Sequence, residues 1–296
     1  MNQNHRSDTV LVGYDGSPAS DRALQWAVEA ARLRRLPLTI CHAWHWPYPL
    51  RPPDEDTLEV VQSAGAIVAD EGVRKAHALA EDLEVRWELE RGWASAMLLK
   101  ASRSARLVVL GARGHGGFEG LVVGSTAVQM AAHADRPVIV VRADSPVAHP
   151  DGGRIVVGVD GSPASESALG FAFEEAALHK GSVTALCSWW DPAALPGPDR
   201  APFSDPEAVR REATARFEHA VRPWQYDFPD IPVEAEFVVD TPRRALINAA
   251  QGASLLVVGD RGIGSAPQML LGPVTQAALQ EAPCPVAVVP AQQNER

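Results

Sequence analysis

Two patterns of apolar and polar positions alternate along the chain. Short apolar runs rich in valine, leucine and isoleucine are typical of buried strands, and longer segments with apolar residues at helical spacing predict helices. Ser17-Pro18 has the residue types of a helix N-cap and first helical position, and alanines follow at helical spacing. Further helices are predicted over 57–82, 94–103 and 124–134. Strands are predicted at 9–14, 38–44, 85–90, 107–110 and 137–141, then at 154–160, 183–189, 233–239, 254–258 and 285–289.

The chain repeats itself after about 145 residues. VGYDGSPASDRAL at 12–24 and VGVDGSPASESAL at 157–169 are identical at ten of thirteen positions. LVVLGARG at 107–114 likewise matches LLVVGDRG at 255–262. A repeat this long is a domain in itself, and a Pro/Gly/Asp-rich segment separates the two copies. We expect domain 1 at 1–143, a linker at 144–153 and domain 2 at 154–296.

Each half therefore alternates five strands with four helices. This alternation predicts a parallel sheet with right-handed crossovers and helices on both faces. The expected fold class is α/β, as two tandem doubly wound domains that each contain a five-stranded parallel sheet.

Composition and charge narrow the class of protein. Hydrophobic residues make up 46% and charged residues 22% of the 296 residues, which is typical of a globular protein. The net charge of −10 argues against non-specific binding to nucleic acid, which depends on neutralising phosphates. No apolar run approaches a membrane span of about 18 residues, and the N-terminus lacks a signal-peptide pattern. The three scattered cysteines favour a reducing compartment, so we expect a cytoplasmic protein.

Open α/β sheets bind ligands beyond the carboxyl ends of strands, where the strand order reverses. Past the fourth strand of domain 1 lie Gly111, Gly114 and Gly124, and Ser125 and Thr126 then begin a helix. Glycines and a helix N-terminus offer backbone N–H groups to a phosphate, although glycines also simply make turns. The same spacing recurs as Gly259, Gly262 and Gly272, which favours phosphate binding.

Asp15 and Asp160 follow the first strand of each domain. Either carboxylate could cap the next turn or helix, a role for which Ser17 and Ser162 compete. Either could instead accept hydrogen bonds from an adenine amino group or a ribose hydroxyl, and the two roles can coexist.

VGYDGS, VGVDGS and the paired glycine loops resemble the universal stress protein family, in particular tandem members of the actinobacterial type. The resemblance covers both halves and implies a Rossmann-like, adenine nucleotide alpha hydrolase-like fold with ATP at the C-terminal edge of its sheet. It also implies a role in stress or dormancy. In that pattern Asp15 contacts the adenine end, the backbone of Ala43 meets adenine, and the glycine loop holds ribose and phosphates. The implied domain 1 site is Gly13, Asp15, Ala43, Gly111, Arg113, Gly114, Gly124, Ser125 and Thr126.

Domain 2 keeps the first part of this pattern and departs from it at the last glycine. Asp160 and Ser188 are 28 residues apart, like Asp15 and Ala43. Gly272 is followed by Pro273, which supplies neither the expected hydroxyl nor an N–H group, although Thr275 could partly substitute. The implied site, with weaker ATP binding, is Gly158, Asp160, Ser188, Gly259, Gly262, Gly272 and Thr275.

The sequence carries little sign of catalysis. It has no GxxxxGK[ST] motif and no lysine in either glycine loop, and Arg113, Arg261 and His115 are the basic candidates near the phosphates. We expect no protein metal site, and Mg²⁺ would arrive with the nucleotide. The leading hypothesis is an ATP-binding regulator; the alternatives are a slow ATPase and a nucleotide-free interaction scaffold with a protein partner that the sequence does not name.

The resemblance also implies how the domains assemble, because the fifth strand is an edge that pairs with its equivalent in this family. Here these edges are the apolar segments 138–141 and 285–289. We expect them to cover each other as a pseudo-dimer within one chain, or to pair two chains as a homodimer.

Overall fold

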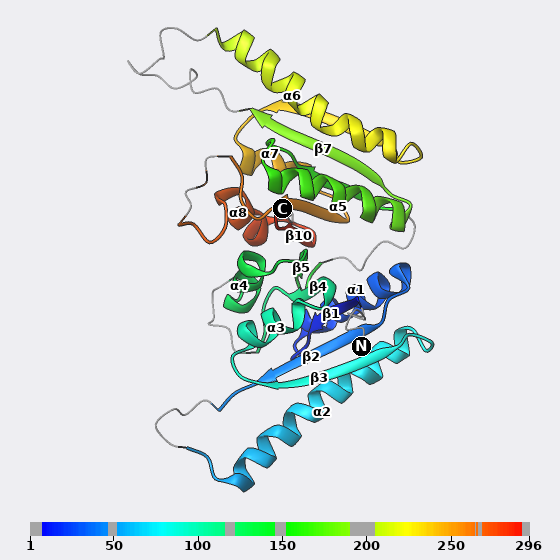
Figure 1. Cartoon of the computed structure of the whole chain (residues 1–296), viewed down its shortest axis with the longest axis vertical. Helices are drawn as coiled ribbons and strands as arrows, with labels where there is room; N and C mark the ends of the chain where they lie inside the picture. Colours follow the sequence, from blue (N-terminus) through cyan, green and yellow to red (C-terminus); the bar gives the residue numbers. More distant parts are fainter. Residues whose placement is uncertain are drawn as a thin grey trace, which may run out of the picture. The chain divides into compact units, whose positions relative to one another are not determined.

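A computed structural model of the chain contains two compact units, Met1–Ala148 (unit 1) and His149–Arg296 (unit 2). The division falls inside the segment 144–153. Each unit holds a five-stranded parallel sheet between helices, as Figure 1 shows. This arrangement confirms the predicted α/β fold class. The structure describes residues 8–46, 52–115, 122–145, 152–189, 205–263, 265 and 268–291.

In unit 1 the strand order is β3-β2-β1-β4-β5, with every neighbouring pair parallel. The chain winds outward from β1 to β3 and then crosses to β4, so the order reverses between β1 and β4. Helices α1 and α2 pack together on one face, and α3 and α4 pack together on the other. The strands are β1 (Thr9–Gly13), β2 (Leu38–Trp44), β3 (Val85–Arg91), β4 (Ala105–Gly111) and β5 (Val138–Val141); the helices are α1 (Pro18–Arg34), α2 (Glu55–Leu79), α3 (Ala94–Ser102) and α4 (Ser125–His133).

Unit 2 repeats this topology with the order β8-β7-β6-β9-β10, so its reversal lies between β6 and β9. Helices α5 and α6 pack together, as do α7 and α8. The strands are β6 (Arg154–Gly158), β7 (Ser182–Trp189), β8 (Val233–Val239), β9 (Leu255–Gly259) and β10 (Val286–Val289); the helices are α5 (Pro163–His179), α6 (Pro206–Asp227), α7 (Pro242–Ala249) and α8 (Pro273–Glu281).

The core sits where the apolar runs predicted it. Val10, Leu11 and Val12 of β1 are at most 1% exposed, because helices cover both faces of this central strand. Ser17 is the N-cap of α1, where its hydroxyl oxygen accepts a hydrogen bond from the Ser20 N–H, and Pro18 begins the helix. The sequence prediction for this helix start is confirmed.

The two long helices are attached to their units by different chemistry. In unit 1 the Tyr14 hydroxyl lies 2.8 Å from Asp21 of α1, and Lys75 of α2 donates to both groups. In unit 2 the ring of Trp224 on α6 lies against Gly170 of α5 and stacks with Phe173 at a centroid distance of 6.1 Å.

None of the helices in the described part of the chain is long and apolar enough to cross a membrane. The three cysteines are free thiols. Burial raises the pKa of Cys41 and of Cys284 to about 12, and that of the half-buried Cys187 to about 11. These thiols are therefore protonated near neutral pH.

Candidate functional site

In unit 1 the Asp15 carboxylate joins the loops that follow β1 and β4. Its Oδ1 accepts a hydrogen bond from the Ser17 N–H at 3.0 Å, and its Oδ2 accepts one from the His115 N–H at 2.9 Å. The Ser17 hydroxyl adds a second link by donating to the carbonyl of Arg113 at 3.3 Å. Asp15 therefore has the turn-forming role that the sequence left open, and its remaining lone pairs can still accept from a ligand.

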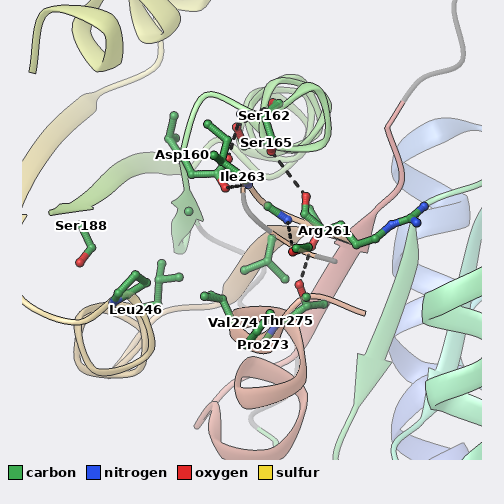
Figure 2. Close-up of a pocket in the computed structure, with 18 of the residues that line it drawn as sticks. Asp160, Ser162, Ser165, Ser188, Leu246, Arg261, Ile263, Pro273, Val274 and Thr275 are labelled. Atoms are coloured by element: carbon green, nitrogen blue, oxygen red, sulfur yellow. Dashed lines mark hydrogen bonds between the residues drawn. The ribbon is translucent and has the colours of Figure 1, made fainter. Parts of the chain in front are cut away.

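Unit 2 forms the same links with equivalent residues. Asp160 accepts from the Ser162 N–H at 2.9 Å and from the Ile263 N–H at 2.8 Å, and the Ser162 hydroxyl donates to the carbonyl of Arg261. Figure 2 shows these contacts at the wall of the unit 2 cavity. The repeated DGSPAS sequence thus builds one loop geometry twice.

The ionised form of Asp15 is favoured in this setting. Burial by itself raises the pKa of the carboxyl, but hydrogen bonds from Ser17, His115 and Ser20 outweigh burial and hold the pKa below its usual 3.8. The His115 ring is exposed, and its Nδ1 lies 3.9 Å from Asp15 Oδ2. His115 contributes its backbone N–H to the loop, which fits its interpretation as a loop histidine.

Packing within each unit explains several of the glycines. A Cβ on Gly111 would lie 2.8 Å from the backbone of Ala19, and one on Gly259 would lie 2.8 Å from the Cβ of Ala164, so both permit close contact between helix and strand. A Cβ on Gly114 would collide with the Asp15 carboxylate. The glycines of the other site positions meet the same kinds of neighbour: Gly262 meets Asp160, Gly13 meets Leu110, and Gly158 meets Leu246.

Gly124 is different, because no described residue of the unit requires a glycine there. Its φ of −74° is open to any residue, and among the described residues a Cβ would meet the carbonyl oxygen of Ala112 at 3.5 Å and the Cα of Arg113 at 3.8 Å, which are ordinary contacts. Gly124 is the N-cap of α4 and has no side-chain cap, so the helix begins with unsatisfied N–H groups beside Ser125 and Thr126. This helix start leaves room for an external anion.

The corresponding start of α8 has fewer donors. Gly272 is the N-cap, Pro273 occupies the first helical position, and no side chain caps the helix. Thr275 is 3% exposed, and its hydroxyl lies 2.7 Å from the carbonyl of Gly259. A hydroxyl has one proton to donate, so that of Thr275 is used inside the unit.

The two loop arginines are in different situations. Arg113 is exposed and has no ion-pair partner among the described residues. The Arg261 Nε lies 3.2 Å from Oδ2 of the buried Asp260, and Figure 2 shows its side chain directed away from the cavity. Unit 1 has Ala112 at the position of Asp260, which explains the difference.

A cavity of about 300 Å³ lies at the C-terminal edge of the unit 2 sheet. All seven predicted domain 2 residues line it. One of them, Ser188, donates its hydroxyl proton to the carbonyl of Asp240. The predicted residues at its wall are Gly158, Asp160, Ser188, Gly259, Gly262, Gly272 and Thr275. Apolar residues that the sequence analysis did not single out also line it, among them Pro242, Leu246, Ile263 and Val274.

Ala43 belongs to the C-terminal edge of the unit 1 sheet, the edge from which the loops after β1 and β4 also leave. It lies near the end of β2, opposite Glu90 of β3, and β2 flanks β1 on the side away from β4.

Among the described residues no three or more His, Cys, Asp or Glu side chains are grouped to hold a metal ion.

Comparisons with known proteins agree with this geometry. A universal stress protein from Mycolicibacterium smegmatis is 34% identical over 291 residues, which covers 95% of this chain and 96% of the relative. One from Mycobacterium tuberculosis is 34% identical over 298 residues, covering 97% of this chain and 99% of the relative. The crystal structure of a universal stress protein from Archaeoglobus fulgidus shares the fold, with a TM-score of 0.71, 19% identity and 98% coverage of both chains.

A crystal structure of a universal stress protein in complex with cAMP matches 47% of this chain and 97% of its own, at 24% identity and a TM-score of 0.37. The model of the universal stress protein family matches residues 7–142 and again residues 153–290. The chain therefore belongs to the universal stress protein family, with one family domain in each half.

Proposed function

We propose that this protein is an ATP-binding regulator of stress response or dormancy, and that unit 1 is its main nucleotide site. The start of α4 carries the proposal. No described residue of the unit requires Gly124 to be glycine, the helix has no side-chain cap, and two hydroxyl residues follow. An anion with several oxygens can use all of these donors at once.

Five residues of the unit 1 site contact the nucleotide directly in this proposal. The base lies near Asp15 and the backbone of Ala43, at the ends of β1 and β2. The phosphates lie at the N-terminus of α4, where Ser125 and Thr126 donate from backbone and hydroxyl, and Arg113 pairs with a terminal phosphate. Mg²⁺ is held by phosphate and water oxygens, because it keeps several waters when it arrives with a nucleotide.

Unit 2 binds ATP more weakly in this scheme. Pro273 removes one backbone N–H and one hydroxyl from the phosphate end. A hydrogen bond to a charged group contributes about 1.5–3 kcal/mol, so one lost bond weakens ATP binding by roughly ten- to a hundredfold.

Isothermal titration with MgATP compares the full chain with Gly124→Glu and the matched control Gly272→Glu. We expect Gly124→Glu to cause the larger loss of binding, because a carboxylate there repels the phosphates while the added Cβ makes only ordinary contacts with the described residues Ala112 and Arg113. A larger loss in Gly272→Glu would contradict the assignment of unit 1 as the main site.

The same samples distinguish a regulator from an enzyme. We expect ATP turnover far below the roughly 10 s⁻¹ that is typical of enzymes, because neither glycine loop supplies a lysine. Turnover of several ATP per second that disappears in Arg113→Ala would show instead that the protein is an ATPase.

The place and assembly of the protein belong to the same proposal. We assign it to the cytoplasm, with nucleotide state controlling contacts to a protein partner. Pairing of the apolar edges Val138–Val141 and Val286–Val289, within one chain or between chains, stays a prediction. Light scattering on the full chain with and without MgATP measures whether two chains associate.

A further inference from the structure

The cavity of unit 2 combines a base end like that of unit 1 with a different phosphate end. At the base end, Asp160 makes the same two backbone contacts as Asp15, and a carboxylate has about four lone-pair positions, so it can accept further hydrogen bonds. Amino or hydroxyl groups of a nucleoside can donate to them. At the phosphate end, Val274 stands where unit 1 has Thr126, and Pro273 stands where it has Ser125.

Charge around the cavity also differs from that of unit 1. Asp260 and Asp240 are carboxylates at positions where unit 1 has Ala112 and Gly92. Each is paired with an arginine: Arg261 lies 3.2 Å from Asp260, and Arg244 lies 3.0 Å from Asp240. Arg261 is thus engaged by Asp260, whereas Arg113 of unit 1 has no ion-pair partner among the described residues and can pair with a phosphate.

The lining is suited to an uncharged ring system. Leu186, Leu246 and Val274 form apolar parts of the wall. Ile263 occupies the position of His115 in unit 1. It is 70% exposed, although its backbone N–H donates a hydrogen bond to Asp160. A flat ligand that covers this side chain removes apolar surface from water. The volume of about 300 Å³ lies at the small end of ligand pockets, which suits a compact ligand.

The structure assigns to unit 2 a site for an uncharged nucleoside of the adenosine type, which it prefers to the triphosphate that unit 1 takes. The preference for adenine rests on the proposed function of unit 1, whose base end unit 2 repeats. The preference for an uncharged ligand rests on unit 2 alone. The chain would then sense a triphosphate in one unit and its dephosphorylated nucleoside in the other.

Hydrogen–deuterium exchange by mass spectrometry on the full chain reads both units in one sample. We expect adenosine to slow amide exchange in the unit 2 loop at 259–263, and MgATP to leave this loop unchanged at concentrations that protect 111–115 of unit 1. The double variant Pro273→Ser/Val274→Thr copies the unit 1 sequence. It should bind MgATP in unit 2 roughly ten- to a hundredfold more tightly for each hydrogen bond restored.

The outcomes separate the two proposals. If MgATP protects unit 1 while adenosine fails to protect 259–263, or MgATP protects that loop equally well, the nucleoside site is overturned and the proposed function stands. If MgATP protects neither unit and Gly124→Glu changes nothing, the proposed function fails, whatever adenosine does. An unchanged ATP affinity of unit 2 in the folded double variant also overturns the inference, because the phosphate end would not be what disfavours ATP.

Discussion

One added methyl group at Gly114 tests whether the Asp15 carboxylate holds the β4 loop in place. Gly114 has no positive φ, so alanine adds no backbone strain, but its Cβ would collide with Asp15 Oδ2. The carboxylate must then move and release the His115 N–H, which it accepts at 2.9 Å. Hydrogen bonds to charged groups contribute about 1.5–3 kcal/mol, so exchange of the His115 amide should accelerate roughly ten- to a hundredfold.

The assay is amide exchange on peptides that cover residues 111–115, because two units in one chain make a single unfolding free energy ill defined. Gly124→Ala is the matched control, since its Cβ meets no atom closer than 3.5 Å. In an Asp15→Ala background the Gly114→Ala change should have little further effect, because the group it displaces is gone. If the His115 amide exchanges equally fast in Gly114→Ala and in the unmodified protein, or if the effects of the two substitutions are fully additive, the Asp15 carboxylate does not hold the β4 loop in place.

Three further predictions concern packing, pH and thiol reactivity. Gly170→Ala should weaken the packing of α5 against α6 by about 1–3 kcal/mol, measured by amide exchange on peptides of these two helices, because its Cβ would lie 2.6 Å from the ring of Trp224. The hydrogen bonds that lower the pKa of Asp15 stabilise the folded state above pH 3.8, and this stabilisation is lost as the pH falls through the lower pKa of the folded state. Because Asn at position 15 does not titrate, Asp15→Asn should lose less thermal stability below about pH 4 than the unmodified protein. With pKa values of about 12, Cys41 and Cys284 should not react with an aromatic disulfide reagent at about pH 8 until urea unfolds the chain.

The strands could be predicted because central strands of a doubly wound sheet are apolar on both faces. Where polar residues interrupt a run, the boundaries shift. β4 begins at Ala105 rather than at 107, since the backbone of Ala105 already pairs with Thr9 although Arg106 breaks the apolar pattern. α2 begins at Glu55 rather than at 57, because the Asp54 carboxylate caps it by accepting from the Thr57 N–H at 2.7 Å.

The glycine loop was harder to interpret, because spacing shows where a glycine is and not what it meets. Gly111 faces Ala19 of α1, and Gly114 faces Asp15; both neighbours lie more than 90 residues away in sequence. Such long-range contacts leave no local signal. Gly124 has no such neighbour, so its glycine is the one that an external ligand best explains.

The pairing of Arg261 with Asp260 could have been found from the repeat. Aligning LVVLGARG with LLVVGDRG places Asp260 opposite Ala112, directly before an arginine. An aspartate that is present in only one copy of the repeat and precedes an arginine indicates an ion pair between the two side chains. The apolar lining from Leu246 and Pro242 could not be found in this way, because it depends on how α7 lies across the end of β6.

The two units separate the residues that shape the loop from those that select a ligand. The carboxylate contacts of Asp15 and Asp160 differ by no more than 0.1 Å between the units, although the first residues of α4 and α8 differ in every hydroxyl. These carboxylate contacts therefore do not depend on which hydroxyls the helix start carries. A change from Ser-Thr to Pro-Val can alter what the site binds and leave these contacts in place, while the N–H groups of Gly124 and Gly272 hold the loops in both units by donating to the carbonyls of Ala112 and Asp260. A duplicated domain can in this way keep its architecture and acquire a second ligand preference through two adjacent residues.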